Sequence, residues 1–246
     1  YNFCKDSIVS EIRKLTLFDP TFISGLELWL SADIGVTKDA SNNVSNWSDQ
    51  SGNGNDAQQL TGGLQPVFVD STIDIKPVLR LDGGDDRLDG GIISGLESSS
   101  LSLFIVSSGA TQVQNKTGII FGINTNLNGF WFTRRTWLSD QFIKVYNVYP
   151  GVLTSDPGSF PNTGYSPTIF TYTKEFNTLS SLYSNGTVLS SSADGLLNGV
   201  FTNSNYIVGN PGTNSLEPSI EGDIAEIILY DTFLNDSLRG LVEQYL

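Results

Sequence analysis

The chain has no histidine and only one cysteine, Cys4, among its 246 residues. Histidine is the most common general base and metal ligand in proteins, so its absence excludes serine–histidine and cysteine–histidine nucleophile schemes within this chain. A single cysteine excludes an intrachain disulfide. A chain of this length buries enough surface to fold without such a cross-link. These absences favour a non-catalytic protein.

Charged residues are also scarce, at 16% of the chain, and 26 acidic residues outnumber 13 basic ones, for a formal net charge of −13. Binding to phosphates needs clustered Lys and Arg. Nucleic acid is therefore not expected as a partner, and neither is an anionic membrane surface. The apolar runs are far shorter than the ~18 residues that span a bilayer. No membrane insertion is expected.

What the chain does have, from Gly25 onward, is a series of short apolar or alternating segments separated by Gly, Asn, Asp and Ser. Such a series is typical of many short strands joined by turns. Residues 101–107 are apolar on both faces, which predicts a central strand. Asn185-Gly186 predicts a tight hairpin. Residues 150–167 lack periodicity and are expected to form a loop. The pattern as a whole predicts an all-β sandwich of two antiparallel sheets.

Short helices are expected at both ends. Ile8, Ile12 and Leu15 recur at helical spacing within residues 4–15. Near the other end, Asn235 or Asp236 is expected to cap a helix that runs to Leu246. We divide the chain into an N-terminal helical arm (1–22) and a β domain (23–246). The arm helix either packs on its own domain or serves as a tether or oligomerisation element, and the sequence leaves both open.

Six sequence segments follow one another along the β domain. They are ISGLELWLSAD (23–33), VSNWSDQSGNGNDA (44–57), KPVLRLDGGDDRL (76–88), LYSNG (182–186), IVG (207–209) and GDIAEIILYD (222–231). In this order they resemble laminin-G-like domains of the concanavalin A-like lectin/glucanase superfamily. The resemblance implies a concanavalin A-like jelly roll. The resemblance does not indicate one function, because lectins, adhesins, structural modules and enzymes all have this fold.

The resemblance also draws attention to Glu221, Asp223 and Glu226, which are similar to the Glu-x-Asp-x-x-Glu strand motif of retaining glucanases in this superfamily. Those enzymes use two carboxylates about 5 Å apart. In a regular strand Glu221 and Asp223 share one face and Glu226 points to the other, so a bulge would be needed to unite the glutamates. Non-enzymatic relatives carry Gly-x-Ile-Ala-Glu at this C-terminal place. We therefore predict that the chain is not an enzyme.

Two oxygen-rich loops, residues 49–56 and 82–89, are candidates for a calcium site. Many relatives hold Ca²⁺ near the rim of the sandwich, and Ca²⁺ prefers carboxylate and carbonyl oxygens. The second loop is favoured, with Asp82, Asp85 and Asp86 as the ligands. The alternative is that Asp and Asn in both loops only cap turns with their own side chains.

Aromatic residues are concentrated between residues 130 and 165. Lectin sites combine an aromatic platform with polar groups that hydrogen-bond to sugar hydroxyls. The ligand-binding residues we predict are Trp137, Arg134, Arg135, Tyr149 and Asp140, because Trp137 and Tyr149 lie near loop junctions and the other three lie close to them. The alternative is that these aromatic side chains fill the core.

The function that these observations favour is a non-catalytic surface-recognition module that binds glycan or a cell-surface receptor. The first alternative is a structural, decoration or fibre module of a phage virion or another surface assembly, anchored or oligomerised through residues 4–15. The third hypothesis is that the domain is a polysaccharide hydrolase. All three place the domain in the extracellular space, on a cell surface or on a virion surface.

Overall fold

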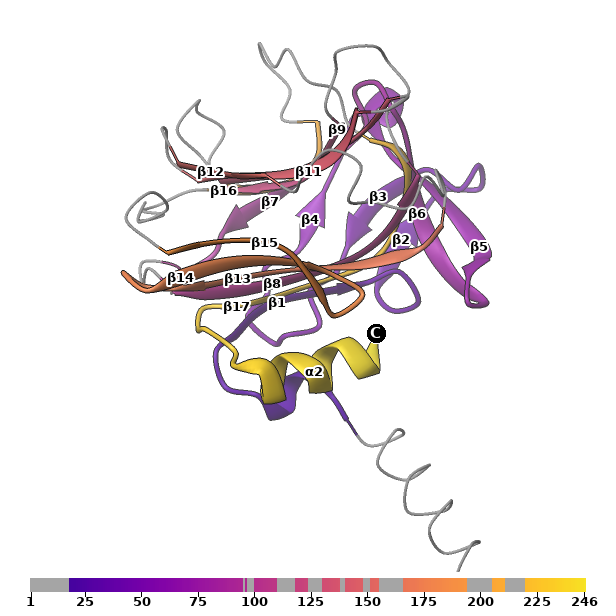
Figure 1. The fold of residues 1–246 in the computed structure, drawn as a ribbon. Helices are drawn as coiled ribbons and strands as arrows, with labels where there is room; N and C mark the ends of the chain where they lie inside the picture. The colour runs from indigo at the N-terminus through magenta and orange to yellow at the C-terminus, as the bar shows by residue number, and fades with distance from the viewer. Residues whose placement is uncertain are drawn as a thin grey trace, which may run out of the picture.

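The computed structural model shows two β-sheets packed face to face, with one helix beneath them (Figure 1). It describes residues 18–94, 96, 100–109, 118–123, 130–137, 140–147, 151–154, 166–193, 205–210 and 220–246. Within 130–154, side chains are described only at 130–134 and 143–145. Among the described residues, no helix is long and apolar enough to cross a membrane.

The strands form an eight-stranded and a nine-stranded sheet, and their pairings are antiparallel. The eight-stranded sheet runs β15 (Thr187–Ala193), β14 (Leu179–Ser184), β13 (Thr168–Glu175), β8 (Leu101–Gly109), β17 (Glu221–Tyr230), β6 (Lys76–Asp82) and β5 (Val67–Ile73), and β1 (Leu26–Ser31) also pairs with β17. The nine-stranded sheet runs β12 (Gly151–Thr154), β11 (Asp140–Asn147), β10 (Phe130–Trp137), β9 (Gly118–Ile123), β16 (Asn205–Gly209), β7 (Arg87–Ile92), β4 (Ala57–Gln58), β3 (Val44–Trp47) and β2 (Val36–Lys38). Two 3₁₀ turns, η1 (Pro20–Phe22) and η2 (Gly62–Leu64), and the helix α2 (Asp236–Tyr245) complete the fold. The predicted all-β sandwich is confirmed.

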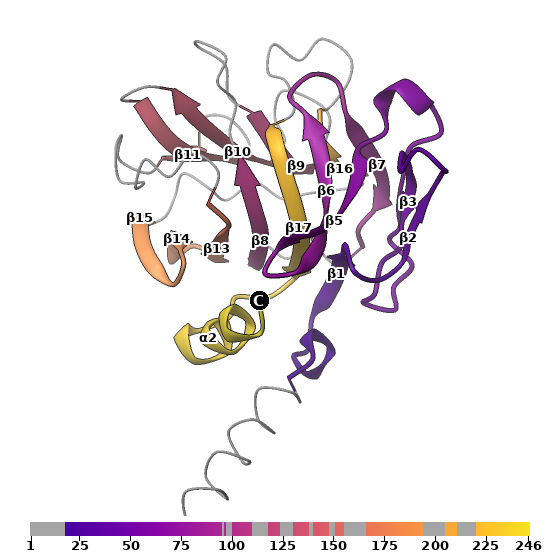
Figure 2. The ribbon, with the colours of Figure 1, turned by 90° about the vertical axis from the view of Figure 1, so that its right-hand side faces the viewer.

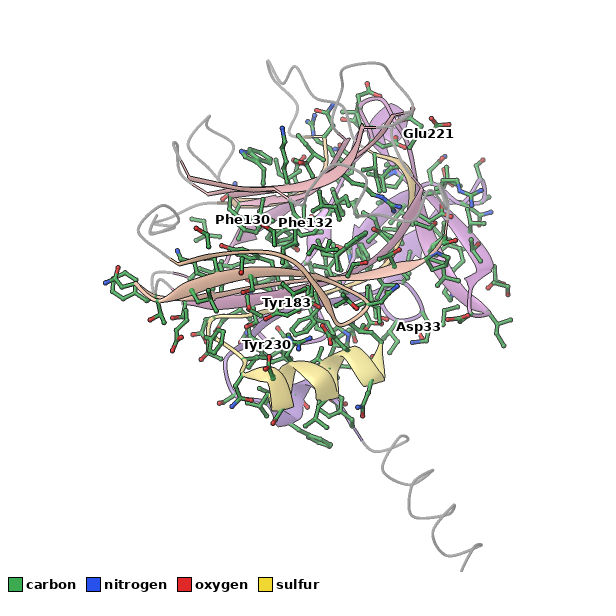
Figure 3. The ribbon with its side chains drawn as sticks, in the orientation of Figure 1. Asp33, Phe130, Phe132, Tyr183, Glu221 and Tyr230 are labelled. Carbon is green, nitrogen blue, oxygen red and sulfur yellow. The ribbon has the colours of Figure 1, made fainter. Side chains whose placement is uncertain are left out.

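The main core lies between the two sheets. Side chains at alternate positions of each strand enter it, because successive residues of a strand point to opposite faces. In β10 the buried Phe130 and Phe132 point into this core, where Figure 3 shows them between the layers. Trp47 of β3 is fully buried there too.

The helix α2 covers the outer face of the eight-stranded sheet (Figures 1 and 3). Asn235 caps it by accepting hydrogen bonds from the backbone N–H groups of Ser237 and Leu238, both at 3.1 Å. Thr171 Oγ1 of β13 donates to Glu243 Oε1 at 2.7 Å. The predicted C-terminal helix and its cap are confirmed.

The last residues of the predicted arm contact the β domain. Tyr230 Oη donates to Pro20 O at 3.0 Å, and the Phe18 ring lies 5.9 Å from the Tyr245 ring. The division of the chain into an arm (1–22) and a β domain (23–246) stays a prediction. The predicted helix over residues 4–15 lies outside the described residues.

Two local predictions had different outcomes. Asn185 and Gly186, at φ 45° and 76°, form the predicted tight turn between β14 and β15. The prediction of a loop throughout 150–167 is wrong at Gly151–Thr154, which form β12 by pairing with residues 144–147 of β11. Four residues are too few to show periodicity, and this strand depends on a neighbour that is already in place.

Candidate functional site

The five predicted ligand-binding residues do not all reach the surface. The Arg134 side chain is only 4% exposed and lies over the Phe170 ring, with Cζ 5.4 Å from the ring centroid. Burial lowers the pKa of its guanidinium to about 10. Arg134 has the same parity along β10 as Phe130 and Phe132, so it points into the sandwich. A direct contact between Arg134 and a surface ligand is therefore wrong for this structure.

The other predicted contacts remain predictions. The backbones of Trp137 and Asp140 pair directly across the β10–β11 hairpin, and Arg135 pairs with Phe142. The side chains of Arg135, Trp137 and Asp140 lie outside the described part of the chain, as does Tyr149 as a whole.

A different aromatic residue, Trp131, occupies the outer face of the nine-stranded sheet. It alternates with the inward-pointing Phe130 and Phe132, and its side chain is partly exposed. Its cross-strand neighbour is Gly122 of β9. An ideal Cβ on Gly122 would lie 2.2 Å from Cε3 of the indole, so the ring occupies the space that any larger residue would fill. A bare glycine thus lets an indole lie against the sheet.

Trp131 belongs to a row of residues that the β pairings align across the nine-stranded sheet. From β10 to β3 the row reads Trp131, Gly122, Ile207, Asp89, Gln58 and Asn46. Their sequence neighbours Trp47, Ala57, Leu88 and Phe121 lie in the main core, so the row faces outward. Figure 1 shows this face on the opposite side of the molecule from α2.

The row joins an aromatic ring to polar groups. Ile207 is 3% exposed, whereas Gln58 is exposed and the Asp89 side chain is 49% exposed. Arg87 Nε donates to Asp89 Oδ2 at 3.1 Å, so this carboxylate is oriented by an ion pair. Along this row the amide, carboxylate and guanidinium groups can hydrogen-bond to sugar hydroxyls, and the indole can stack on a sugar ring. We refer to these exposed groups, Trp131, Arg87, Asp89 and Gln58, as the platform.

Among the described residues, the predicted metal ligands Asp82, Asp85 and Asp86 do come together, with ligand oxygens within 4.8 Å of one another. Asp86 is 6% exposed, and its pKa is raised to about 6 by burial, followed by the nearby charges of Asp82 and Asp85. One carboxylate oxygen of Asp86 already accepts a hydrogen bond from the Asp82 N–H at 2.9 Å. One carboxylate oxygen of Asp82 accepts a hydrogen bond from the Gly84 N–H at 2.8 Å. The other carboxylate oxygens are hard donors that fit Ca²⁺.

The competing loop, residues 49–56, uses its carboxylates internally. Asp49 accepts hydrogen bonds from the backbone N–H groups of Trp29, Ser51 and Asn55 at 2.9–3.0 Å and from Ser51 Oγ at 2.6 Å. Asp56 accepts from the Asp49 N–H at 2.9 Å. These bonds fasten the loop to β1, which is the turn-capping role that the sequence left open.

The glucanase-like motif on β17 is arranged differently from the regular strand we expected. A register shift between Ile224 and Glu226 places Glu226 on the outer face of the eight-stranded sheet, where Asp223 also lies. Asp223 pairs with Arg80 at 2.6 and 2.9 Å. Glu226, 2% exposed, accepts hydrogen bonds from Trp29 Nε1 and Tyr245 Oη. Figure 3 shows Glu221 at the far end of β17 from α2. Glu226 thus connects α2 to the sheet through Tyr245, and Asp223 adds an ion pair between the neighbouring strands β17 and β6. That the chain is not an enzyme stays a prediction.

These features define a jelly-roll sandwich of two antiparallel sheets with two candidate sites on its surface. No protein-family model matches the chain, and no curated protein is significantly similar to it in sequence. Solved structures do match. Domain 4 of AbnA, a GH43 extracellular arabinanase from Geobacillus stearothermophilus solved with arabinotriose, has a TM-score of 0.62 and 18% identity over 90% of this chain and 98% of that one.

Two further matches come from larger proteins. The sialidase of Trypanosoma rangeli, in complex with sialic acid, has a TM-score of 0.63 and 14% identity over 90% of this chain. The receptor-binding domain of botulinum neurotoxin D has a TM-score of 0.63 and 16% identity over 92% of this chain. The chain spans 33% of the sialidase and 53% of the toxin structure. At these identities the likeness shows the jelly-roll fold alone, and the narrower laminin-G-like assignment stays a prediction.

Proposed function

We propose that this domain is a surface-recognition module that binds glycan through the platform on the nine-stranded sheet. The observation that carries the proposal is the Trp131 indole, which occupies the space over Gly122 in the same cross-strand row as Asp89 and Gln58. Strands lie about 4.8 Å apart, so Asp89 and Gln58 lie roughly 14 and 19 Å along the row from Trp131. An oligosaccharide that follows this row would meet both an apolar ring face and fixed hydrogen-bonding groups. The absence of histidine and the structural use of Asp223 and Glu226 favour binding over hydrolysis.

The structural neighbours support the same class of function. One is a domain solved with arabinotriose, and another is the receptor-binding domain of a neurotoxin. The arabinanase is an extracellular protein, and we propose an extracellular location for this chain as well. The alternative, a structural module of a surface assembly, depends on residues 4–15, which lie outside the described part of the chain.

The binding proposal is tested by screening the protein on a glycan array and measuring the affinity for the best ligand by calorimetry. Replacing Trp131 with alanine is expected to weaken binding about tenfold or more, because buried aromatic contacts dominate such interfaces. Gly122→Ala is expected to weaken binding as well, since the new Cβ displaces the indole.

Two matched controls separate the platform from general effects. Gly91→Ala adds a Cβ that meets nothing within 4 Å, and Phe22→Ala removes an aromatic ring that is 70% exposed beside α2. Both variants are expected to bind as the wild type does. An array without ligands, or a Trp131→Ala variant with unchanged affinity, would show that the proposal is wrong.

We also propose that Asp82, Asp85 and Asp86 hold Ca²⁺ at the rim of the sandwich. Ca²⁺ at a hundredfold excess over its dissociation constant is expected to raise the free energy of unfolding by about 2.7 kcal/mol. The pKa of Asp86, about 6, predicts that this stabilisation fades as the pH falls through that value, because protons then compete for the carboxylate. Asp85→Asn should abolish it.

The measurement is thermal unfolding with and without millimolar CaCl₂ at pH 5 and pH 7.5. Asp70→Asn removes an exposed carboxylate outside the cluster and serves as the control. A shift of equal size in the Asp85→Asn variant would contradict the site. So would the lack of any shift at pH 7.5.

A further inference from the structure

An apolar patch lies where the described chain begins. Phe18 contacts two aromatic rings, Phe22 at 6.5 Å and Tyr245 at 5.9 Å between centroids. Phe22 is 70% exposed, and Leu241, one helical turn before Tyr245, is 44% exposed. We call these four residues, Phe18, Phe22, Leu241 and Tyr245, the helix-side patch. Figure 2 shows η1, in indigo, and α2 at the same end of the molecule.

The helix-side patch adjoins the buried cluster beneath α2, but the sheet does not cover it. Val242, on the adjacent position of α2, is fully buried with Trp29 and Ile228 in the cluster beneath the helix. The apolar stripe of α2 therefore extends beyond the part that the sheet covers, and Leu241 is its uncovered edge. Uncovered apolar side chains that gather in one place indicate a contact site rather than scattered surface residues.

The sequence that precedes Phe18 has a matching apolar pattern. Ile8, Ile12 and Leu15 recur at helical spacing, and only Thr16 and Leu17 separate this pattern from Phe18. A helix of about twelve residues is marginal in water on its own and is stabilised mainly by packing of its apolar face. That face needs a partner surface, and the nearest one along the chain is the helix-side patch.

We propose that residues 4–15 form a helix that docks on the helix-side patch of the same chain. Two residues suffice to join packed helical elements. A short linker also holds the segment at an effective concentration of about millimolar. Three apolar side chains bury much less than the roughly 800 Å² per partner that a stable dimer needs, so docking within one chain is favoured over docking on a second copy.

Charge favours the same contact. The segment carries Lys5, Arg13 and Lys14 against Asp6 and Glu11, whereas the whole chain has 13 basic and 26 acidic residues. A weakly basic helix would thus lie on a strongly acidic domain, where attraction between opposite charges adds to apolar burial. The N-terminal segment then completes the domain and is not a free tether.

Limited trypsin digestion of the full chain tests the proposal, because Arg13 and Lys14 are cleavage sites inside the segment. Cleavage there, followed by intact-mass spectrometry, is expected to be slow in the wild type and about fivefold faster or more in Leu241→Gln, since cleavage follows the population of the undocked state. Gln is a good helix former, so α2 is expected to persist. Phe22→Ser should act in the same direction.

The control is Leu60→Gln, which removes an 87% exposed leucine outside the patch and should leave the cleavage rate unchanged. Circular dichroism and melting curves confirm that each variant is folded. Cleavage after Arg13 as fast in the wild-type chain as in an isolated peptide of residues 1–17 would overturn docking. Protection that grows with protein concentration would overturn docking within one chain and assign the contact to a second copy.

Discussion

Gly90→Ala is expected to lower the free energy of unfolding by about 3 kcal/mol, because the new methyl group has no room in the core and overpacking is costly. An ideal Cβ on Gly90 would lie 2.0 Å from Cε1 and 2.1 Å from Cζ of Tyr206. The ring cannot easily move away. It stacks on Phe121 at 5.8 Å, and its hydroxyl donates to Asn55 O at 2.6 Å.

The adjacent glycine gives a matched control for this prediction. A Cβ on Gly91 would meet nothing within 4 Å, so Gly91→Ala should change stability little. Urea denaturation of both variants measures the difference. In a Tyr206→Leu background the cost of Gly90→Ala should shrink, because residues in contact do not act additively. Equal effects of the two alanine substitutions would show that the Tyr206 ring has more freedom than its contacts indicate.

Much of the fold could be predicted from local pattern. Residues 101–107, apolar on both faces, do form the central strand β8, and Asn185-Gly186 and Asn235 mark a turn and a helix cap. These signals lie within a few residues of one another, so no knowledge of the tertiary structure is needed. β12 was missed because its pairing with β11, not its own composition, makes it a strand.

The candidate site could be predicted less well, because its residues meet only through strand pairing. Trp131, Asp89 and Gln58 are far apart in sequence, and only the order of five strands places them in one row. One error was avoidable. Phe130, Phe132 and Arg134 share parity, so alternation along a single strand already indicates that Arg134 points inward with the phenylalanines.

Glu226→Leu is expected to lower the free energy of unfolding by about 3 kcal/mol, because buried donors that lose their acceptor cost roughly 1–3 kcal/mol each. The donors are Trp29 Nε1, 2.7 Å from Glu226 Oε1, and Tyr245 Oη, 2.8 Å from the same oxygen. Glu226→Gln keeps a carbonyl oxygen in this place and should cost much less. The two variants together separate hydrogen bonding from charge.

The pH dependence has a definite sign. Burial raises the pKa of Glu226 above its ordinary 4.5, and the hydrogen bonds from Trp29 and Tyr245 and the charge of Lys76 only partly oppose this. The folded state therefore holds the proton more tightly than the unfolded chain, so the wild type loses stability as the pH rises from below 4.5 through the folded pKa. Glu226→Gln lacks this titration.

Urea denaturation of the wild type and Glu226→Gln from pH 3.5 to pH 7 measures the effect. Taking the difference between the two proteins removes the titration of the other carboxylates. Relative to the wild type, the glutamine variant should gain stability as the pH rises through the window and stay level above it. A difference that is constant with pH would place the Glu226 carboxylate in a more polar setting than its burial implies. If the leucine and glutamine variants were equally unstable, Glu226 would not be the acceptor that fastens α2 to the sheet.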